Sequence, residues 1–201
     1  MSSPAPPYVY LARHGQTAYN YEGRFQGQQA IPLDDTGREQ AAELAQRAKP
    51  YGFSALWCSP LLRARETADI VAAAIGLQPL EDARLMETDA GDWTDRSFAE
   101  VIALAPQSFA AFASADPGFA FPGGESLADQ EERVGAALEQ VERGPLPALV
   151  VCHGMVIRAA LAVRGADPQD IQRVPNAALV PLQATAAEDL DPDGGAAPLA
   201  S

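Results

Sequence analysis

The stretch Val9–Asn20 reads VYLARHGQTAYN, an apolar run that ends in an arginine and in His14, with a glycine directly after the histidine. Near the other end of the chain, Ala148–Gly154 reads ALVVCHG and repeats this layout around His153. The chain has 201 residues, and these are its 2 histidines. Short apolar runs bounded by turn residues are typical of buried β-strands. Both imidazoles, which change charge near neutral pH, are therefore expected at the carboxyl ends of strands.

Strand and helix patterns alternate along the chain. The predicted strands are 8–12, 55–58, 148–152 and 179–183, and the predicted helices are 36–49, 60–75, 97–104, 107–113, 126–143 and 155–163. Strands separated by helices of this length form right-handed β-α-β units. We therefore expect an α/β fold with a mostly parallel sheet covered on both faces. Ligands bind such sheets outside the carboxyl ends of the strands, where segments distant in sequence converge.

The helix boundaries rest on capping residues. Asp35 or Thr36 is the expected N-cap of the first helix. Ser59, followed by Pro60 at the first helical position, is the expected N-cap of the second helix, and Gly76 is expected to end it.

Composition limits the class of protein. The length fits a single domain, expected over 8–185, with disordered segments at 1–7 and at the acidic stretch 186–201. The net charge of −13 argues against nucleic-acid and anionic-membrane partners. No apolar run approaches the roughly 20 residues that span a bilayer, and the start lacks a secretory signal, so we expect a cytoplasmic protein. Cys58 and Cys152 each end an apolar run and are expected to be buried without a disulfide.

Two arginines are positioned to hold an anion. Arg13 puts a guanidinium beside His14, and its planar donors suit phosphate or carboxylate oxygens. Arg63 falls in the first turn of the second predicted helix, where it adds to the positive end of the helix. The alternative for Arg63 is a weak surface ion pair with Glu66, and Arg65 is expected to be such a surface arginine.

Several short motifs follow one another between residues 8 and 183. They are RHGxTxxN at 13–20, GRFQG at 23–27, Pro-Leu-Asp-Asp-Thr-Gly at 32–37, SPLLRARETA at 59–68, RLME at 84–87, GDW at 91–93, FPGGES at 121–126 and VVCHGMVIR at 150–158. A lone Arg-His-Gly occurs easily by chance, but the ordered set is specific. It resembles the histidine phosphatase superfamily, the phosphoglycerate-mutase-like enzymes. The resemblance implies a three-layer α/β/α sandwich, in agreement with the strand and helix pattern.

By this resemblance, His14 is the nucleophile that takes up the phosphoryl group. Arg13, Arg63 and His153 hold the phosphoryl oxygens, and Asn20 is a further contact. Attack by a neutral imidazole nitrogen splits phosphate-ester hydrolysis into two easier transfers through a phosphohistidine, and fixed positive donors stabilise the charge. The second ring nitrogen of such a nucleophile is expected to bond a backbone carbonyl, which fixes the tautomer. This chemistry requires no metal and no cofactor.

The resemblance assigns proton transfer to Glu87, which gives a proton to the leaving alkoxide and then takes one from the attacking water. The assignment rests on the RLME context before GDW. Asp89 and Asp92 are nearby alternatives because acidic residues are abundant in this chain.

The remaining candidate substrate contacts are Gln26, Gly154, Glu125 and Ser126. Gln26 belongs either to the rim of the site or to its substrate-facing side, and Asn20 has the alternative role of closing a turn. The segment 123–126 also has a structural explanation, because its glycines make a turn and Ser126 caps a helix together with Asp129. In the family this segment borders the substrate.

The expected function is a metal-independent phosphomonoesterase acting on small phosphorylated metabolites. The main alternative is a phosphoglycerate mutase that depends on 2,3-bisphosphoglycerate. A mutase must keep its phosphohistidine from water, which takes covering segments. Here the span 91–122 is short and carries one basic residue, Arg96. Gln16 also replaces a glutamate common in the mutase branch, and Trp93-Thr94-Asp95 replaces a more typical Trp-Glu-Gly.

A non-catalytic phosphate-binding relative is a further alternative. Such a protein is expected to have lost His14, Arg63 or His153, and all three are present. The few basic residues expected beyond the phosphate site favour small esters that are not highly charged. No uncovered apolar stripe indicates an oligomeric state.

Overall fold

The structure, a computed structural model, describes residues 8–166 and 174–182. The predicted disordered segments 1–7 and 186–201 lie outside the described residues, as does the predicted end of the last strand at Gln183. The described strands are β1 (Val9–Arg13), β2 (Ala55–Cys58), β3 (Pro79–Glu81), β4 (Ala148–Cys152) and β5 (Leu179–Pro181). The described helices are α1 (Ala18–Glu22), α2 (Asp35–Ala48), α3 (Leu62–Ile75), α4 (Phe98–Leu104), α5 (Pro106–Ala113), α6 (Leu127–Glu142) and α7 (Gly154–Val163).

The five described strands form one mostly parallel sheet in the order β3-β2-β4-β1-β5. β4 pairs in parallel with β1 and β2, β3 extends the parallel part beside β2, and β5 runs antiparallel to β1. Arg13 lies opposite Cys152 in the register of β1 and β4. The two histidines that follow these residues therefore leave the sheet side by side, and the His14 amide donates to the Cys152 carbonyl at 3.0 Å.

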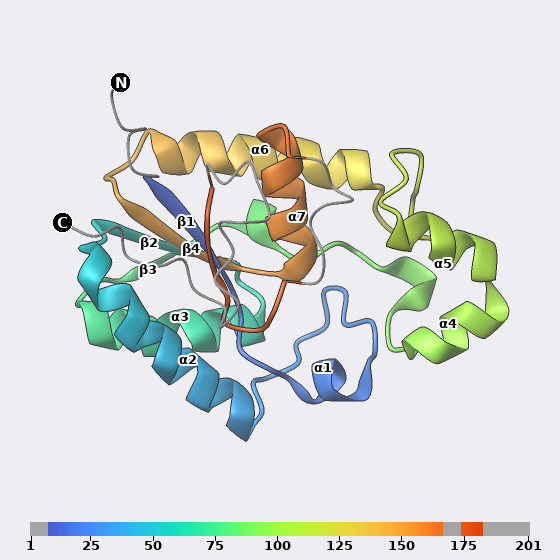
Figure 1. Cartoon of the computed structure of the whole chain (residues 1–201), viewed down its shortest axis with the longest axis horizontal. Helices are drawn as coiled ribbons and strands as arrows, with labels where there is room; N and C mark the ends of the chain where they lie inside the picture. Colours follow the sequence, from blue (N-terminus) through green and yellow to red (C-terminus); the bar gives the residue numbers. More distant parts are fainter. Residues whose placement is uncertain (1–7, 167–173, 183–201) are drawn as a thin grey trace.

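Helices cover both faces of the sheet (Figure 1). Tyr10 and Ala12 pack with α2 and α3, whereas Val9 and Leu11 pack with α6 and α7. This alternation along β1 follows from the two-residue period of a strand, which sends successive side chains to opposite faces. The three-layer α/β/α sandwich expected from the sequence is confirmed.

The beginnings of two helices differ from the prediction. Asp34, one residue earlier than expected, caps α2 and accepts from the Gly37 amide at 2.7 Å. α3 begins at Leu62, and its N-cap Leu61 makes no side-chain capping bond. The N-cap is therefore Leu61 and not Ser59. The Ser59 hydroxyl instead accepts a hydrogen bond from the Leu61 amide and forms another with the His153 imidazole.

The segment between β3 and α6 forms a separate aromatic layer beyond the carboxyl ends of the strands. Figure 1 shows α4 and α5 at that end, away from the sheet. Phe25 from the loop after α1 and Leu127 of α6 complete its buried core, whose other members are Ala90, Trp93, Val101, Phe119 and Phe121. β3 and α1 are also absent from the predicted elements, since runs of three and five residues carry little periodicity.

Cys58 and Cys152 are buried and free, as predicted. Within the described ranges, no helix has the length and apolarity to cross a membrane.

Candidate active site

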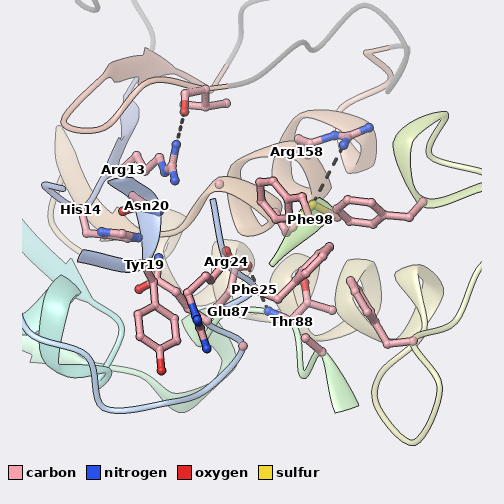
Figure 2. Close-up of a pocket in the computed structure, with 18 of the residues that line it drawn as sticks. Arg13, His14, Tyr19, Asn20, Arg24, Phe25, Glu87, Thr88, Phe98 and Arg158 are labelled. Atoms are coloured by element: carbon pink, nitrogen blue, oxygen red, sulfur yellow. Dashed lines mark hydrogen bonds between the residues drawn. The ribbon is translucent and has the colours of Figure 1, made fainter. Parts of the chain in front are cut away.

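A cavity of about 400 Å³ opens at the carboxyl ends of the strands. Figure 2 shows Arg13, His14 and Asn20 on one side of it and Phe98 and Arg158 on the opposite side. The lining residues come from the end of β1, the segment 19–27 that includes part of α1, the segment 87–90, α4, α5, α7, Phe121 and Val174. The cavity therefore joins the α/β sandwich to the aromatic layer.

His14 is 2% exposed and lines this cavity. Its Nδ1 lies 2.6 Å from the Gly15 carbonyl, the hydrogen bond expected of a nucleophilic histidine. Burial, helped by the charges of Arg63 and Arg13, holds the pKa of His14 well below its usual value. The ring is therefore neutral at pH 7, and a proton on Nδ1 leaves the Nε2 lone pair for attack on an electrophile.

The loop that carries His14 packs closely against the backbone at Gly37. A Cβ on Gly15 would lie 2.2 Å from the Gly37 carbonyl oxygen, and one on Gly37 would lie 2.0 Å from that of Gln16. Only glycine fits at either position. Gln16 is a structural residue of this loop, since its side chain donates to Asp34 at 3.1 Å.

His153 is fully buried beside His14, with the two ring centroids 5.2 Å apart. Its Nε2 lies 2.8 Å from the hydroxyl of Ser59, and its buried Nδ1 has no partner among the described residues. Burial, with Arg63 and His14, lowers the pKa of His153 well below its usual value, so this ring is neutral too. If Ser59 donates to Nε2, the proton of His153 resides on Nδ1.

The two predicted arginines approach the histidines from different elements. Arg63 on α3 is fully buried, and its two terminal nitrogens donate to the Gly27 and Gln29 carbonyls at 2.8 and 3.0 Å. Burial lowers the pKa of Arg63 to about 10, with Glu87 acting in the opposite direction, so the group stays charged at pH 7. Its Nε is buried without a partner in the described structure. Arg13 lines the cavity and donates to the Val174 carbonyl at 2.5 Å.

Asn20 both lines the cavity and closes a turn, so the two roles considered from the sequence are compatible. It forms a reciprocal capping box with Thr17 at the start of α1. Gln26 also lines the cavity, and its side chain accepts from the Thr17 hydroxyl at 3.0 Å. Asn176, which the sequence did not suggest, donates to the His14 carbonyl at 3.0 Å and to Asn20 at 3.1 Å.

Among the three acids considered for proton transfer, Glu87 alone lines the cavity. Its carboxylate accepts from the Thr88 amide at 3.0 Å, which fixes its direction. Asp89 instead accepts from the Gly91 amide at 3.0 Å within its own turn. The geometry thus favours Glu87 over Asp89 and Asp92.

None of the residues 123–126 lines the cavity. Gly154, the other candidate contact, does line it. Glu125 forms a bidentate ion pair with Arg133, whose Nε and Nη2 donate to the two carboxylate oxygens at 2.5 and 2.8 Å. Ser126 caps α6 in a capping box with Asp129. Ser126 therefore caps a helix, as its structural explanation predicted, and neither Glu125 nor Ser126 lines the cavity.

Two more arginines line the cavity, which corrects the expectation of few basic residues beyond the phosphate site. Arg24 pairs with Asp95 at 2.7 Å and lies over the ring of Tyr19. Arg158 follows Gly154 by four residues on α7, a spacing of one helical turn that could have revealed it in the sequence. By contrast, Arg65 pairs with Asp69 on the surface, as predicted.

The rest of the lining is largely apolar: Phe25, Ala90, Phe98, Phe112, Ala113, Phe121, Met155 and Val174. Over residues 8–166 and 174–182, no three His, Cys, Asp or Glu side chains gather closely enough to bind a metal ion.

The sequence matches the model of the histidine phosphatase superfamily (branch 1) over residues 9–188. It is 36% identical over 152 residues to the probable phosphoglycerate mutase GpmB of Escherichia coli O1:K1, an alignment that covers 74% of this chain and 70% of the relative. The corresponding Klebsiella pneumoniae protein matches to the same extent.

Two similar solved structures are described as phosphatases. A mycobacterial glucosyl-3-phosphoglycerate phosphatase in complex with VO3 superimposes with a TM-score of 0.78 at 31% identity, covering 86% of this chain and 90% of that one. A phosphoserine phosphatase from Entamoeba histolytica in complex with 3-phosphoglyceric acid gives a TM-score of 0.75 at 25% identity, covering 85% and 87%.

Proposed function

Because the chain belongs to the histidine phosphatase superfamily, we propose that it is a metal-independent phosphomonoesterase. It hydrolyses small phosphorylated metabolites in the cytoplasm through a phosphohistidine on His14, and its partners include neither nucleic acid nor a membrane. Relatives with known structures are described as enzymes that act on, or bind, small phosphorylated compounds, which supports this substrate class.

The observation that carries the proposal is a neutral nucleophile beside buried donors. His14 has its Nδ1 bonded to Gly15, which leaves Nε2 for attack. The Nδ1 of His153 and the Nε of Arg63 are buried without a partner in the described part of the chain. Buried donors are nearly always satisfied, so this pair calls for an acceptor. The oxygens of a phosphoryl group held against His14 supply it.

In the first step, Nε2 of His14 attacks phosphorus while the ester P–O bond breaks. The carboxylic acid of Glu87 gives its proton to the leaving alkoxide, which departs as the alcohol. Arg13, Arg63 and His153 stabilise the charge that builds on the phosphoryl oxygens.

In the second step, water attacks the phosphohistidine and the P–N bond breaks. The Glu87 carboxylate takes the proton from the water, so inorganic phosphate leaves and His14 returns to its neutral form. Ser59 is a positioning residue in both steps. By donating to Nε2 of His153, it keeps a proton on Nδ1, where a phosphoryl oxygen can accept it.

A phosphoglycerate mutase is the second candidate, because the curated relatives at 36% identity carry that name. A mutase returns the phosphoryl group to the product, whereas a phosphatase gives it to water. The two functions therefore differ in the fate of the phosphohistidine and share the first step.

The proposal is tested by phosphate release from a panel of phosphorylated metabolites that includes 3-phosphoglycerate, with His14→Ala as the inactive control. Release by the wild type and none by the variant is the expected result. If no compound releases phosphate, the next assay is interconversion of 3- and 2-phosphoglycerate primed with 2,3-bisphosphoglycerate, and its success would establish the mutase instead.

A further inference from the structure

We propose that the alcohol part of the substrate is apolar and binds against one wall of the cavity, a wall formed by Phe25, Phe98, Phe112, Phe121 and Met155. This inference rests on the proposed function and narrows its substrate class to phosphate monoesters of alcohols or phenols that carry an aromatic or bulky aliphatic group. We call these five side chains the aromatic wall.

The four rings of the aromatic wall pack against one another. Phe25 meets Phe98 and Phe112 edge-on, with centroids 4.7 and 5.5 Å apart, and Phe112 lies 5.5 Å from Phe121. Trp93, which does not line the cavity, supports three of these rings at 5.2 to 5.9 Å. Interlocked rings of this kind present a preformed apolar surface, which binds an apolar group at little conformational cost.

The aromatic wall shares one cavity with the phosphate site. Arg13, His14, Asn20 and Glu87 line the same space, which Figure 2 shows reaching from His14 to Phe98. A group joined through the ester oxygen to a phosphoryl group at His14 therefore extends past Glu87 toward the rings. The volume of about 400 Å³ lies in the range of small-molecule sites, which are mostly apolar with a few convergent polar groups.

Two arginines, Arg24 and Arg158, lie near the aromatic wall. Arg24 is committed to Asp95 and to the Tyr19 ring, so its charge is compensated within the protein. Arg158 lies against Met155, with its Nη1 4.0 Å from the sulfur. An anionic ester such as phosphoserine could instead use these arginines, which makes it the natural competitor in the test.

The test compares two primary alkyl esters, 3-phenylpropyl phosphate and glycerol 3-phosphate, with phosphoserine as a third. The two alkyl esters have similar leaving oxygens, so a difference in kcat/KM reports binding of the alcohol part. We expect the wild type to prefer phenylpropyl phosphate. Phe112→Ala should lower kcat/KM for that ester by about tenfold and leave the other two within about twofold, because only the apolar contact is lost.

Phe109→Ala is the matched control. Phe109 lies on the same helix, α5, and contacts Phe112 and Trp93, but it does not line the cavity. Its removal should leave the preference between esters unchanged. The proposal is overturned if Phe109→Ala reproduces the effect, if Phe112→Ala slows all three esters equally, or if the wild type prefers phosphoserine or glycerol phosphate.

A binding assay separates this inference from the proposed function. Calorimetry with 3-phenylpropyl phosphate and the His14→Ala protein needs no turnover, and we expect binding that weakens about tenfold when Phe112→Ala is added. If the enzyme released no phosphate from any ester, that binding would still report on the wall. Equal binding by the single and double variants would overturn the inference whatever the reaction proves to be.

Discussion

The two halves of the cavity are built in different ways. The phosphate half consists of Arg13 and His14, which line the cavity, together with Arg63 and His153, which are fully buried and do not line it. Backbone hydrogen bonds such as that from His14 to Cys152 hold this half in place. The aromatic half consists of rings from the loop after α1 and from the segment 98–121, which pack against one another. In our proposal the first half binds the phosphoryl group, and the second half selects the group that is attached to it.

Substitutions in the phosphate half should therefore slow all esters alike, whereas substitutions in the aromatic half should act on some esters only. Glu87 lies between the halves and should combine both behaviours.

Apart from loss of His14, Glu87→Gln is expected to have the largest effect on turnover. It should slow alkyl phosphates by about 10²–10³-fold, because their alkoxides need a proton to leave. Aryl phosphates should slow far less, since phenolates leave without one. The measurement is kcat on paired alkyl and aryl esters, with Asp89→Asn as the control. Equal slowing of both ester classes would mean that the acid lies elsewhere.

Ser59→Ala should lower kcat by about 10- to 100-fold with little change in KM, an effect comparable to the loss of a partner that orients a functional histidine. The reason is that His153 loses the hydroxyl that fixes its tautomer. Because Ser59 acts on the phosphate half through His153, alkyl and aryl esters should be affected equally. Ser59→Thr keeps a hydroxyl and should recover part of the rate. A loss that differs between ester classes contradicts the assigned role.

The histidines allow the phosphate half to be tested without substrate. Burial lowers the pKa of His14 below its usual 6.5, so the folded protein binds fewer protons than the unfolded chain. Its contribution to the free energy of unfolding therefore decreases as pH falls below about 6.5. Relative to His14→Asn, the wild type should lose up to about 1.4 kcal/mol per pH unit there. Urea unfolding at neutral and acidic pH measures this difference, and a pH-independent difference contradicts the buried neutral ring.

The smallest expected effect is that of a chelator. Phosphate release in excess EDTA should match that of the untreated enzyme, because arginines and His153 are proposed to supply the positive charge. Loss of activity that returns when a divalent metal is added would refute the metal-independent mechanism.

The proximity of the two histidines was predictable from the sequence. His14 and His153 follow apolar runs, and strand topology brings such positions together wherever they lie in the chain. The prediction of Glu87 depended on resemblance, since a loop acid has no periodicity. Ser59 was interpreted as a helix cap, because the Ser-Pro pattern is the same whether the hydroxyl bonds a helix amide or an imidazole.

The aromatic half was not predictable in the same way. Phe25, Phe98, Phe112 and Phe121 are scattered over several segments, and each has the sequence context of an ordinary core residue. Which ring faces a cavity and which faces the core depends on side-chain packing. Phe112 and Phe109 illustrate this, since they lie on one helix and only Phe112 lines the cavity.

The proposed mechanism requires a covalent phosphohistidine on His14. The most direct measurement mixes enzyme and substrate rapidly, quenches in alkali because phosphohistidine is acid-labile, and locates the phosphoryl group by mass spectrometry of the digested protein. We predict a phosphorylated His14 that forms before steady-state release of phosphate and decays when substrate is exhausted. A turning-over enzyme with no phosphorylated His14, or with the phosphoryl group on another residue, would contradict this claim.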